Sequence, residues 1–153
     1  MTPAEPPRRP ALSPRGSLPT VAKVAIGLEV LLAVGALVGG AILFFSPDGS
    51  AFGMPLWLLE HAGFESFRIP GLILFVVNGL FPLVSAVATL RRLPWAPTSV
   101  IAVGVLLVGW IIVQVALLRS FYLPLHGAYL LLGLVIAALG LARHRSQRQS
   151  PNR

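Results

Sequence analysis

The sequence contains no cysteine, and only 11% of its 153 residues are charged. The absence of cysteine excludes disulfides, thiolate metal sites and thiol redox chemistry. Acidic residues are especially scarce, with five in the whole chain. A soluble domain usually carries about 25% charged residues, so water is not the main solvent of this chain.

Hydrophobic residues make up 56% of the sequence, and they are concentrated in four unbroken runs, at about 21–45, 70–90, 98–118 and 123–142. Each run has about the 20 residues that an α-helix needs to cross some 30 Å of hydrocarbon. Short connections make consecutive helices antiparallel neighbours. The sequence therefore predicts an all-α fold: an integral membrane four-helix transmembrane bundle over residues 20–142.

The two ends of the chain are polar. Residues 1–19 hold six prolines and three arginines, a composition that buries too little to fold, so we expect a disordered tail. Residues 143–153 form a short basic tail. The net charge of +7 does not indicate nucleic-acid binding, because the basic residues flank hydrophobic runs instead of forming an interleaved basic and aromatic surface.

Lysine and arginine are distributed unequally between the two sides of the predicted bundle, and such a bias sets the orientation of membrane helices. Only Arg68 and Arg119 lie on one side. The other ten lie in the N-terminal segment, the loop after the second run and the C-terminal tail: Arg8, Arg9, Arg15, Lys23, Arg91, Arg92, Arg143, Arg145, Arg148 and Arg153. We therefore expect a multi-pass protein of the plasma membrane with both termini in the cytoplasm.

Residues 54–64, on the expected outer side, combine Trp57 and several leucines with Glu60 and His61. The segment is too short to span the bilayer but suits the membrane surface. We expect it to form a short external interfacial helix.

Glu29 is the only acidic residue well inside an apolar run, about 9 Å deeper than Lys23. A carboxylate at that depth has to be protonated, paired, or in contact with water or protein. Helical spacing places Ala33, Ala36 and Gly40 on its face, a narrow stripe that lets another helix approach. We expect Glu29 to point into the bundle, either as a structural group or as a proton-linked or ligand-binding carboxylate; the alternative is a side chain that extends toward the membrane interface.

Asn78 and Gln114 are further polar candidates within the predicted spans. Pro82 cannot donate the backbone hydrogen bond that the carbonyl of Asn78 would accept, so we expect a kink at this point. The freed carbonyl and the Asn78 amide would form a polar spot able to bind an ion or a substrate.

Small residues at helical spacing indicate close helix packing. Gly35 and Gly39 form a GxxxG pair, and Gly133 and Ala137 form a similar pair in the fourth run. These surfaces suit contacts within the bundle, with a second copy of the chain, or with another membrane protein.

Five charged or titratable side chains lie on the predicted outer side, where they can either anchor the protein at the membrane surface or form an outward-facing pocket: Glu60, His61, Arg68, Arg119 and His126. The two histidines have no fixed ligand spacing such as HExxH, so we expect no metal. No nucleophile elbow, phosphate-binding loop or dinucleotide fingerprint is present, and we expect no cofactor.

The layout of one helix, an outer loop with a short apolar segment, the sequence IPGLIL at residues 69–74 opening the second helix, and a tight final hairpin resembles small bacterial membrane proteins of DoxX-like topology. The resemblance covers about residues 20–142 and implies a bacterial inner-membrane protein. It assigns no functional residue.

Three functions are compatible with these patterns. The leading hypothesis is a non-catalytic accessory or assembly subunit that acts through helix–helix contacts. The second is a small oligomeric transporter or channel that uses Glu29 and Asn78. The third is a membrane enzyme with an outward-facing site.

Overall fold

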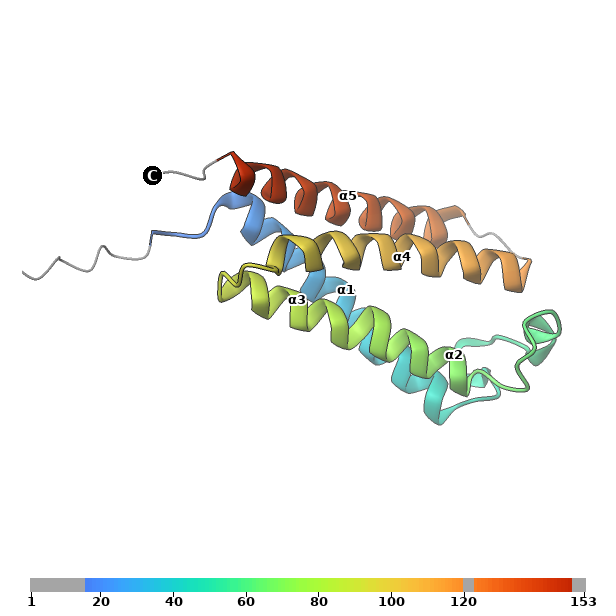
Figure 1. Cartoon of the computed structure of the whole chain (residues 1–153). Helices are drawn as coiled ribbons and strands as arrows, with labels where there is room; N and C mark the ends of the chain where they lie inside the picture. Colours follow the sequence, from blue (N-terminus) through green and yellow to red (C-terminus); the bar gives the residue numbers. More distant parts are fainter. Residues whose placement is uncertain (1–15, 120–122, 150–153) are drawn as a thin grey trace, which may run out of the picture.

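The computed structural model describes residues 16–119 and 123–149, and within them the chain forms four long helices and no strand (Figure 1). The first is α1, Thr20–Phe45, and the last two are α4, Ala96–Leu118, and α5, Leu123–Arg148. The second has three continuous parts: α2, Arg68–Ile73; the π-helical segment η3, Leu74–Leu80; and α3, Phe81–Leu90. All four are long and apolar enough to cross a membrane, which agrees with the predicted all-α four-helix bundle.

The helices begin and end close to the limits expected from hydropathy, except at the C-terminal end. There α5 continues through residues 143–148, which the sequence had suggested were part of a basic tail. Arginine and glutamine, which make up four of these six residues, favour helix, so the chain need not unwind where its hydrophobic run stops. Residues 1–15 and 150–153, the remainder of the expected tails, lie outside the described residues.

Between α1 and α2 the chain forms two single turns of 3-10 helix, η1 (Ser50–Phe52) and η2 (Leu56–Leu59). The expected external helix is therefore shorter than the interval 54–64. Leu59 is buried and packs with Leu43 and Phe67, whereas Trp57 is 61% exposed. This segment caps one end of the bundle, here called the η1–η2 end; the opposite end, where α1 begins and α5 stops, is called the terminal end.

The bundle consists of two helical hairpins (Figure 1). In one, α1 lies against α2, η3 and α3; in the other, α4 lies against α5. Gly40 of α1 and Gly71 of α2 allow these two helices of the first hairpin to pack closely, because a Cβ atom on either glycine would come within 3.0 Å of backbone atoms of the other helix. The stripe of Ala33, Ala36 and Gly40 thus receives a neighbouring helix, as its spacing predicted.

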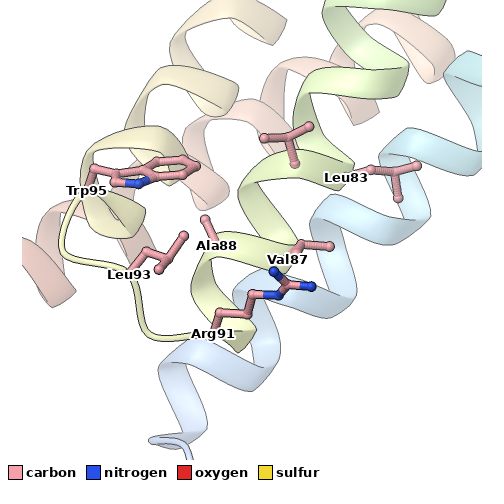
Figure 2. Close-up of a pocket in the computed structure, with 7 residues that line it drawn as sticks. Leu83, Val87, Ala88, Arg91, Leu93 and Trp95 are labelled. Atoms are coloured by element: carbon pink, nitrogen blue, oxygen red, sulfur yellow. The ribbon is translucent and has the colours of Figure 1, made fainter.

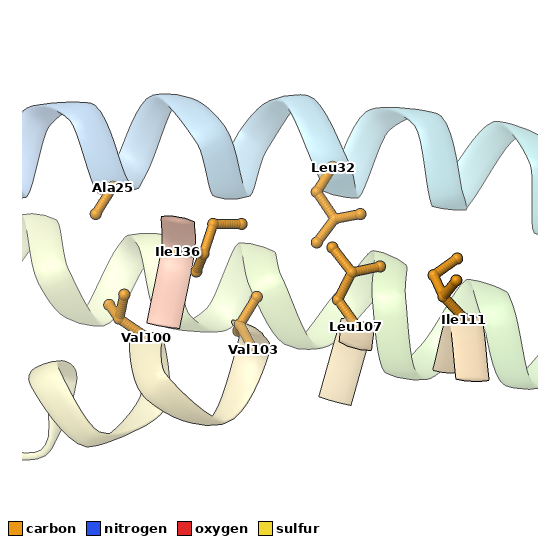
Figure 3. Close-up of a cluster of buried hydrophobic side chains, with 7 residues drawn as sticks. All are labelled: Ala25, Leu32, Val100, Val103, Leu107, Ile111 and Ile136. Atoms are coloured by element: carbon orange, nitrogen blue, oxygen red, sulfur yellow. The ribbon is translucent and has the colours of Figure 1, made fainter. Parts of the chain in front are cut away.

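A narrow apolar core joins the hairpins (Figure 3). Val100, Val103, Leu107 and Ile111 recur along one face of α4 and form one cluster with Ala25 and Leu32 of α1, where Leu107 lies opposite Leu32. Large apolar side chains elsewhere point outward, for example Phe45 at 82% and Leu31 at 67% exposure. An apolar exterior around a small core is the arrangement expected when lipid, and not water, surrounds the helices.

Candidate functional site

A cavity of about 550 Å³ lies between the two hairpins toward the η1–η2 end, where Figure 1 shows them spreading apart. Every long helix contributes to its wall. Met54, Leu59 and Phe64 of the connection between α1 and α2 also line the cavity and cover it at this end. Leu32 and Leu107 line it and also belong to the apolar core. The lining is therefore mostly aliphatic and aromatic, as in sites for apolar small molecules.

Four polar side chains interrupt this apolar lining: Asn78, Gln114, His126 and Tyr129. They come from η3, α4 and α5, so the cavity brings together residues that are far apart in the sequence. Asn78 is 1% exposed, and its amide Nδ2 has no hydrogen-bond partner among the described residues. A buried amide without a partner costs about 1–3 kcal/mol, so a group that accepts its hydrogen bond would stabilise the site.

The π-helical geometry of η3 explains how Asn78 comes to lie in the wall. Pro82 has no backbone N–H, so an α-helical bond to the carbonyl of Asn78 is impossible. In the preceding turn the backbone hydrogen bonds instead join residues five apart, as in a π-helix. The N–H of Phe81, for example, donates to the carbonyl of Val76. The expected irregularity at Asn78 and Pro82 is thus a π-helical segment, a feature frequent at functional sites.

The two predicted small-residue surfaces have different places in the structure. Gly35 and Gly39 line the cavity, and a Cβ atom on Gly35 would lie 3.8 Å from the Tyr129 hydroxyl. Gly133 and Ala137 instead pack against Gly104 of α4, within the second hairpin. Gly133 and Ala137 therefore face another helix of the same chain, whereas Gly35 lines the cavity and is also exposed on the side of the bundle.

A separate polar cluster lies on the terminal-end side of the cavity and contains Glu29, which is completely buried. The Ser85 hydroxyl of α3 is hydrogen-bonded to Glu29 Oε1, with 2.6 Å between the two oxygens. Ser99 Oγ of α4 lies 2.9 Å from Ser85 Oγ and 2.8 Å from the carbonyl oxygen of Ala96. Glu29 Oε2 has no partner among the described residues.

The second charged member of this region is Arg143 of α5, which donates a hydrogen bond of 3.1 Å to Thr89 Oγ1. Together with Glu29, Ser85 and Ser99, this bond brings polar groups from all four long helices to one end of the bundle. The sequence predicted that Glu29 points into the bundle but did not identify Ser99 and Arg143 as members of the polar cluster at this end. Their only sequence signal was their position at the terminal end of their helices.

Most of the charged residues predicted to form an outer pocket do not line the cavity in the structure. Glu60, His61, Arg68 and Arg119 are exposed and do not line the cavity; the Arg68 guanidinium lies 5.7 Å from the centre of the Phe44 ring. Of the five candidates His126 alone reaches the cavity, beside Gln114. Within residues 16–119 and 123–149, no three His, Asp or Glu side chains are placed to hold a metal ion.

A smaller pocket of about 270 Å³ lies near the α3–α4 connection. Figure 2 shows its wall, formed by apolar side chains of α3 together with Arg91, Leu93 and Trp95. Arg91 and Trp95 are exposed, and no buried polar group points into this depression. The larger cavity is therefore the stronger candidate for a binding site.

Comparison with protein-family models, with curated proteins and with solved structures finds no match to this chain. The similarity to proteins of DoxX-like topology therefore stays a resemblance in the order of the helices and loops. The chain's own residues form two candidate sites: a mostly apolar cavity with a buried amide that has no partner among the residues described, and a buried polar cluster around Glu29.

Proposed function

We propose that this is a small non-catalytic membrane protein that binds a lipid-soluble amphiphile in the large cavity. The observation that carries the proposal is the Asn78 amide, which is buried in a mostly apolar wall and whose Nδ2 has no hydrogen-bond partner within the described part of the chain. Its N–H groups can donate to a hydroxyl, ether or carbonyl oxygen of a ligand. The surrounding wall suits the ligand's hydrocarbon part.

The size and the position of the cavity both favour such a ligand. Its volume of about 550 Å³ lies within the range of roughly 300–1,000 Å³ typical of small-molecule sites. Gly35, Ile73, Val113 and Leu125 line it and are also exposed on the sides of the bundle. A molecule dissolved in the bilayer can therefore enter between the helices without crossing water.

We place the protein in the plasma membrane of a bacterium, with both termini in the cytoplasm and the cavity in the outer half of the bilayer. The excess of lysine and arginine at the terminal end supports this orientation. Trp95 at that end and Trp57 at the η1–η2 end are both exposed, as expected of aromatic residues at the two membrane surfaces.

The alternative functions have less support from the geometry. An assembly subunit was suggested by two small-residue surfaces, which in the structure face this chain's own cavity and helices. A transporter using Glu29 and Asn78 would have to open the apolar layer of Leu32 and Leu107 at the cavity wall, since both side chains are almost completely buried. A membrane enzyme would need the outer charged residues brought together, and of these only His126 lines the cavity.

Photo-crosslinking in liposomes tests the proposal. The probe is a long-chain alcohol with a diazirine at the middle of its chain, and mass spectrometry locates the labelled residues. We expect label on cavity-lining residues of α1, η3 and α4. Asn78→Leu removes the amide donors, and because one hydrogen bond contributes about 0.5–1.5 kcal/mol, labelling should fall roughly two- to tenfold.

Two further variants control the experiment. Gly39→Phe fills the cavity, since a Cβ atom there meets only the Leu74 side chain at 3.7 Å, and should abolish specific labelling. Val76→Leu changes an exposed residue of the same η3 segment and should leave labelling unchanged. Label spread evenly over lipid-facing residues, and unaffected by Asn78→Leu and Gly39→Phe, would refute the proposal.

A further inference from the structure

The polar cluster around Glu29 contains three consecutive oxygen–oxygen contacts. Glu29 Oε1 lies 2.6 Å from Ser85 Oγ, Ser85 Oγ lies 2.9 Å from Ser99 Oγ, and Ser99 Oγ lies 2.8 Å from the carbonyl oxygen of Ala96. All three distances are those of O–H···O hydrogen bonds. Each contact therefore requires a proton between its two oxygens.

Counting the available protons decides the charge of Glu29. The two serine hydroxyls supply one proton each, and the Ala96 carbonyl supplies none. An ionised Glu29 would thus leave one of the three contacts as two oxygens pressed together without a hydrogen. A protonated Glu29 supplies the third proton: its O–H donates to Ser85, Ser85 donates to Ser99, and Ser99 donates to Ala96.

The second carboxyl oxygen supports the same conclusion. Glu29 is 0% exposed, and Oε2 has no hydrogen-bond partner among the described residues. A buried carboxylate needs partners for both oxygens to offset the loss of water, whereas the neutral acid leaves only a carbonyl-type oxygen unpaired. The arrangement suits the uncharged form.

We propose that Glu29 is a proton-binding site, with its carboxyl protonated in this structure and donating into a chain of two serine hydroxyls. The ligand is the proton itself. This inference is independent of the large cavity, because none of the atoms in the chain lines it. Either proposal can therefore fail without the other.

Few charged side chains lie near Glu29 in the described part of the structure. The segments α3 and α4 contain no titratable side chain, and Lys23 of α1 is exposed. From α5, Arg143 is the charged side chain that acts on Glu29, and it donates its hydrogen bond to Thr89 instead of to the carboxyl. Its charge can stabilise the carboxylate that remains when the proton leaves.

Loss of the proton would reverse the hydrogen-bond chain. Ser85 would donate to the Glu29 carboxylate and Ser99 to Ser85, and the Ala96 carbonyl in the first turn of α4 would lose its hydroxyl donor. Proton binding at Glu29 thus sets which serine donates in the Ser85–Ser99 hydrogen bond between α3 and α4, and whether Ser99 donates to Ala96 within α4. The proton lost goes to water at that end of the bundle.

Infrared spectroscopy of the full-length protein in liposomes at neutral pH tests the proposal. A protonated carboxyl group has a C=O stretching band that a carboxylate lacks. We expect this band in the parent protein, its loss in Glu29→Gln, and its persistence in Glu60→Gln, which changes an exposed carboxyl and is the matched control. In Ser85→Ala the band should move to higher frequency, because the acid loses its acceptor.

Each outcome of the infrared measurement either supports the protonated Glu29 or contradicts it. A parent protein without the band at neutral pH, or a band that survives in Glu29→Gln, would overturn the proposal. If Glu29→Gln does not fold, Ser85→Ala and Ser99→Ala still test the chain. The first should shift the band more than the second, because it removes the direct acceptor, and an unshifted band in both contradicts the assignment.

Discussion

Replacement of Gly104 by alanine should separate the two helices of the second hairpin. A Cβ atom at this position would lie 2.5 Å from both the backbone nitrogen of Ala137 and the carbonyl oxygen of Gly133, and 2.8 Å from the Ala137 Cβ. Favourable contacts between such atoms are about 3.5–4.0 Å long, so α4 and α5 must move apart by roughly 1 Å. The obstructing atoms are mostly backbone, which cannot rotate away.

The expected destabilisation follows from this overlap. Forcing a methyl group into a tightly packed contact costs about 1–3 kcal/mol, and the better helix propensity of alanine offsets at most about 1 kcal/mol of it. Gly109→Ala is the matched control, because the same change in the same helix meets no atom within 4 Å. It should be neutral or slightly stabilising.

Unfolding of both variants by sodium dodecyl sulfate in mixed micelles, followed by circular dichroism, measures the difference. Gly104→Ala should unfold at a clearly lower detergent fraction than Gly109→Ala. Equal stability of the two variants would refute the helix contact as described, because the only difference between them is the space available to the new methyl group.

Three further predictions follow from the structure. Glu29→Leu should be about 1–3 kcal/mol less stable in the same unfolding assay than Glu29→Gln, because leucine removes the hydrogen bond between residue 29 and Ser85 and leaves Ser85 only its contact with Ser99; equal stability would show that this bond contributes nothing. Because the chain has no cysteine, an impermeant thiol reagent applied to intact cells should label Ser50→Cys and spare Gln149→Cys, and the opposite pattern would reverse the proposed orientation. The pKa of Asp48 is held below its usual value, first by the Ser50 hydroxyl at 2.8 Å and then by the Ser50 backbone N–H. Ser50→Ala should therefore raise that pKa in an NMR titration, and an unchanged value would mean that the hydroxyl bond is absent in solution.

The sequence alone was sufficient for the class of fold and the approximate limits of its helices. Length and hydropathy are properties of each segment by itself, and a run of about 20 apolar residues has few alternatives to a spanning helix. The inward direction of Glu29 was also predictable, since the alanines and the glycine on its face show which side of α1 another helix can approach.

The partners of each buried polar group were decided only by the tertiary structure. Ser85 meets Glu29 across 56 residues, and Ser99 joins them from a third helix; these contacts depend on how far each helix is rotated and shifted against its neighbours. The spreading of the hairpins around Asn78 likewise depends on how α4 and α5 pack as a pair. Hydropathy carries no information about rotation or register, because every face of a membrane helix can be apolar, and close packing alone selects the faces that meet.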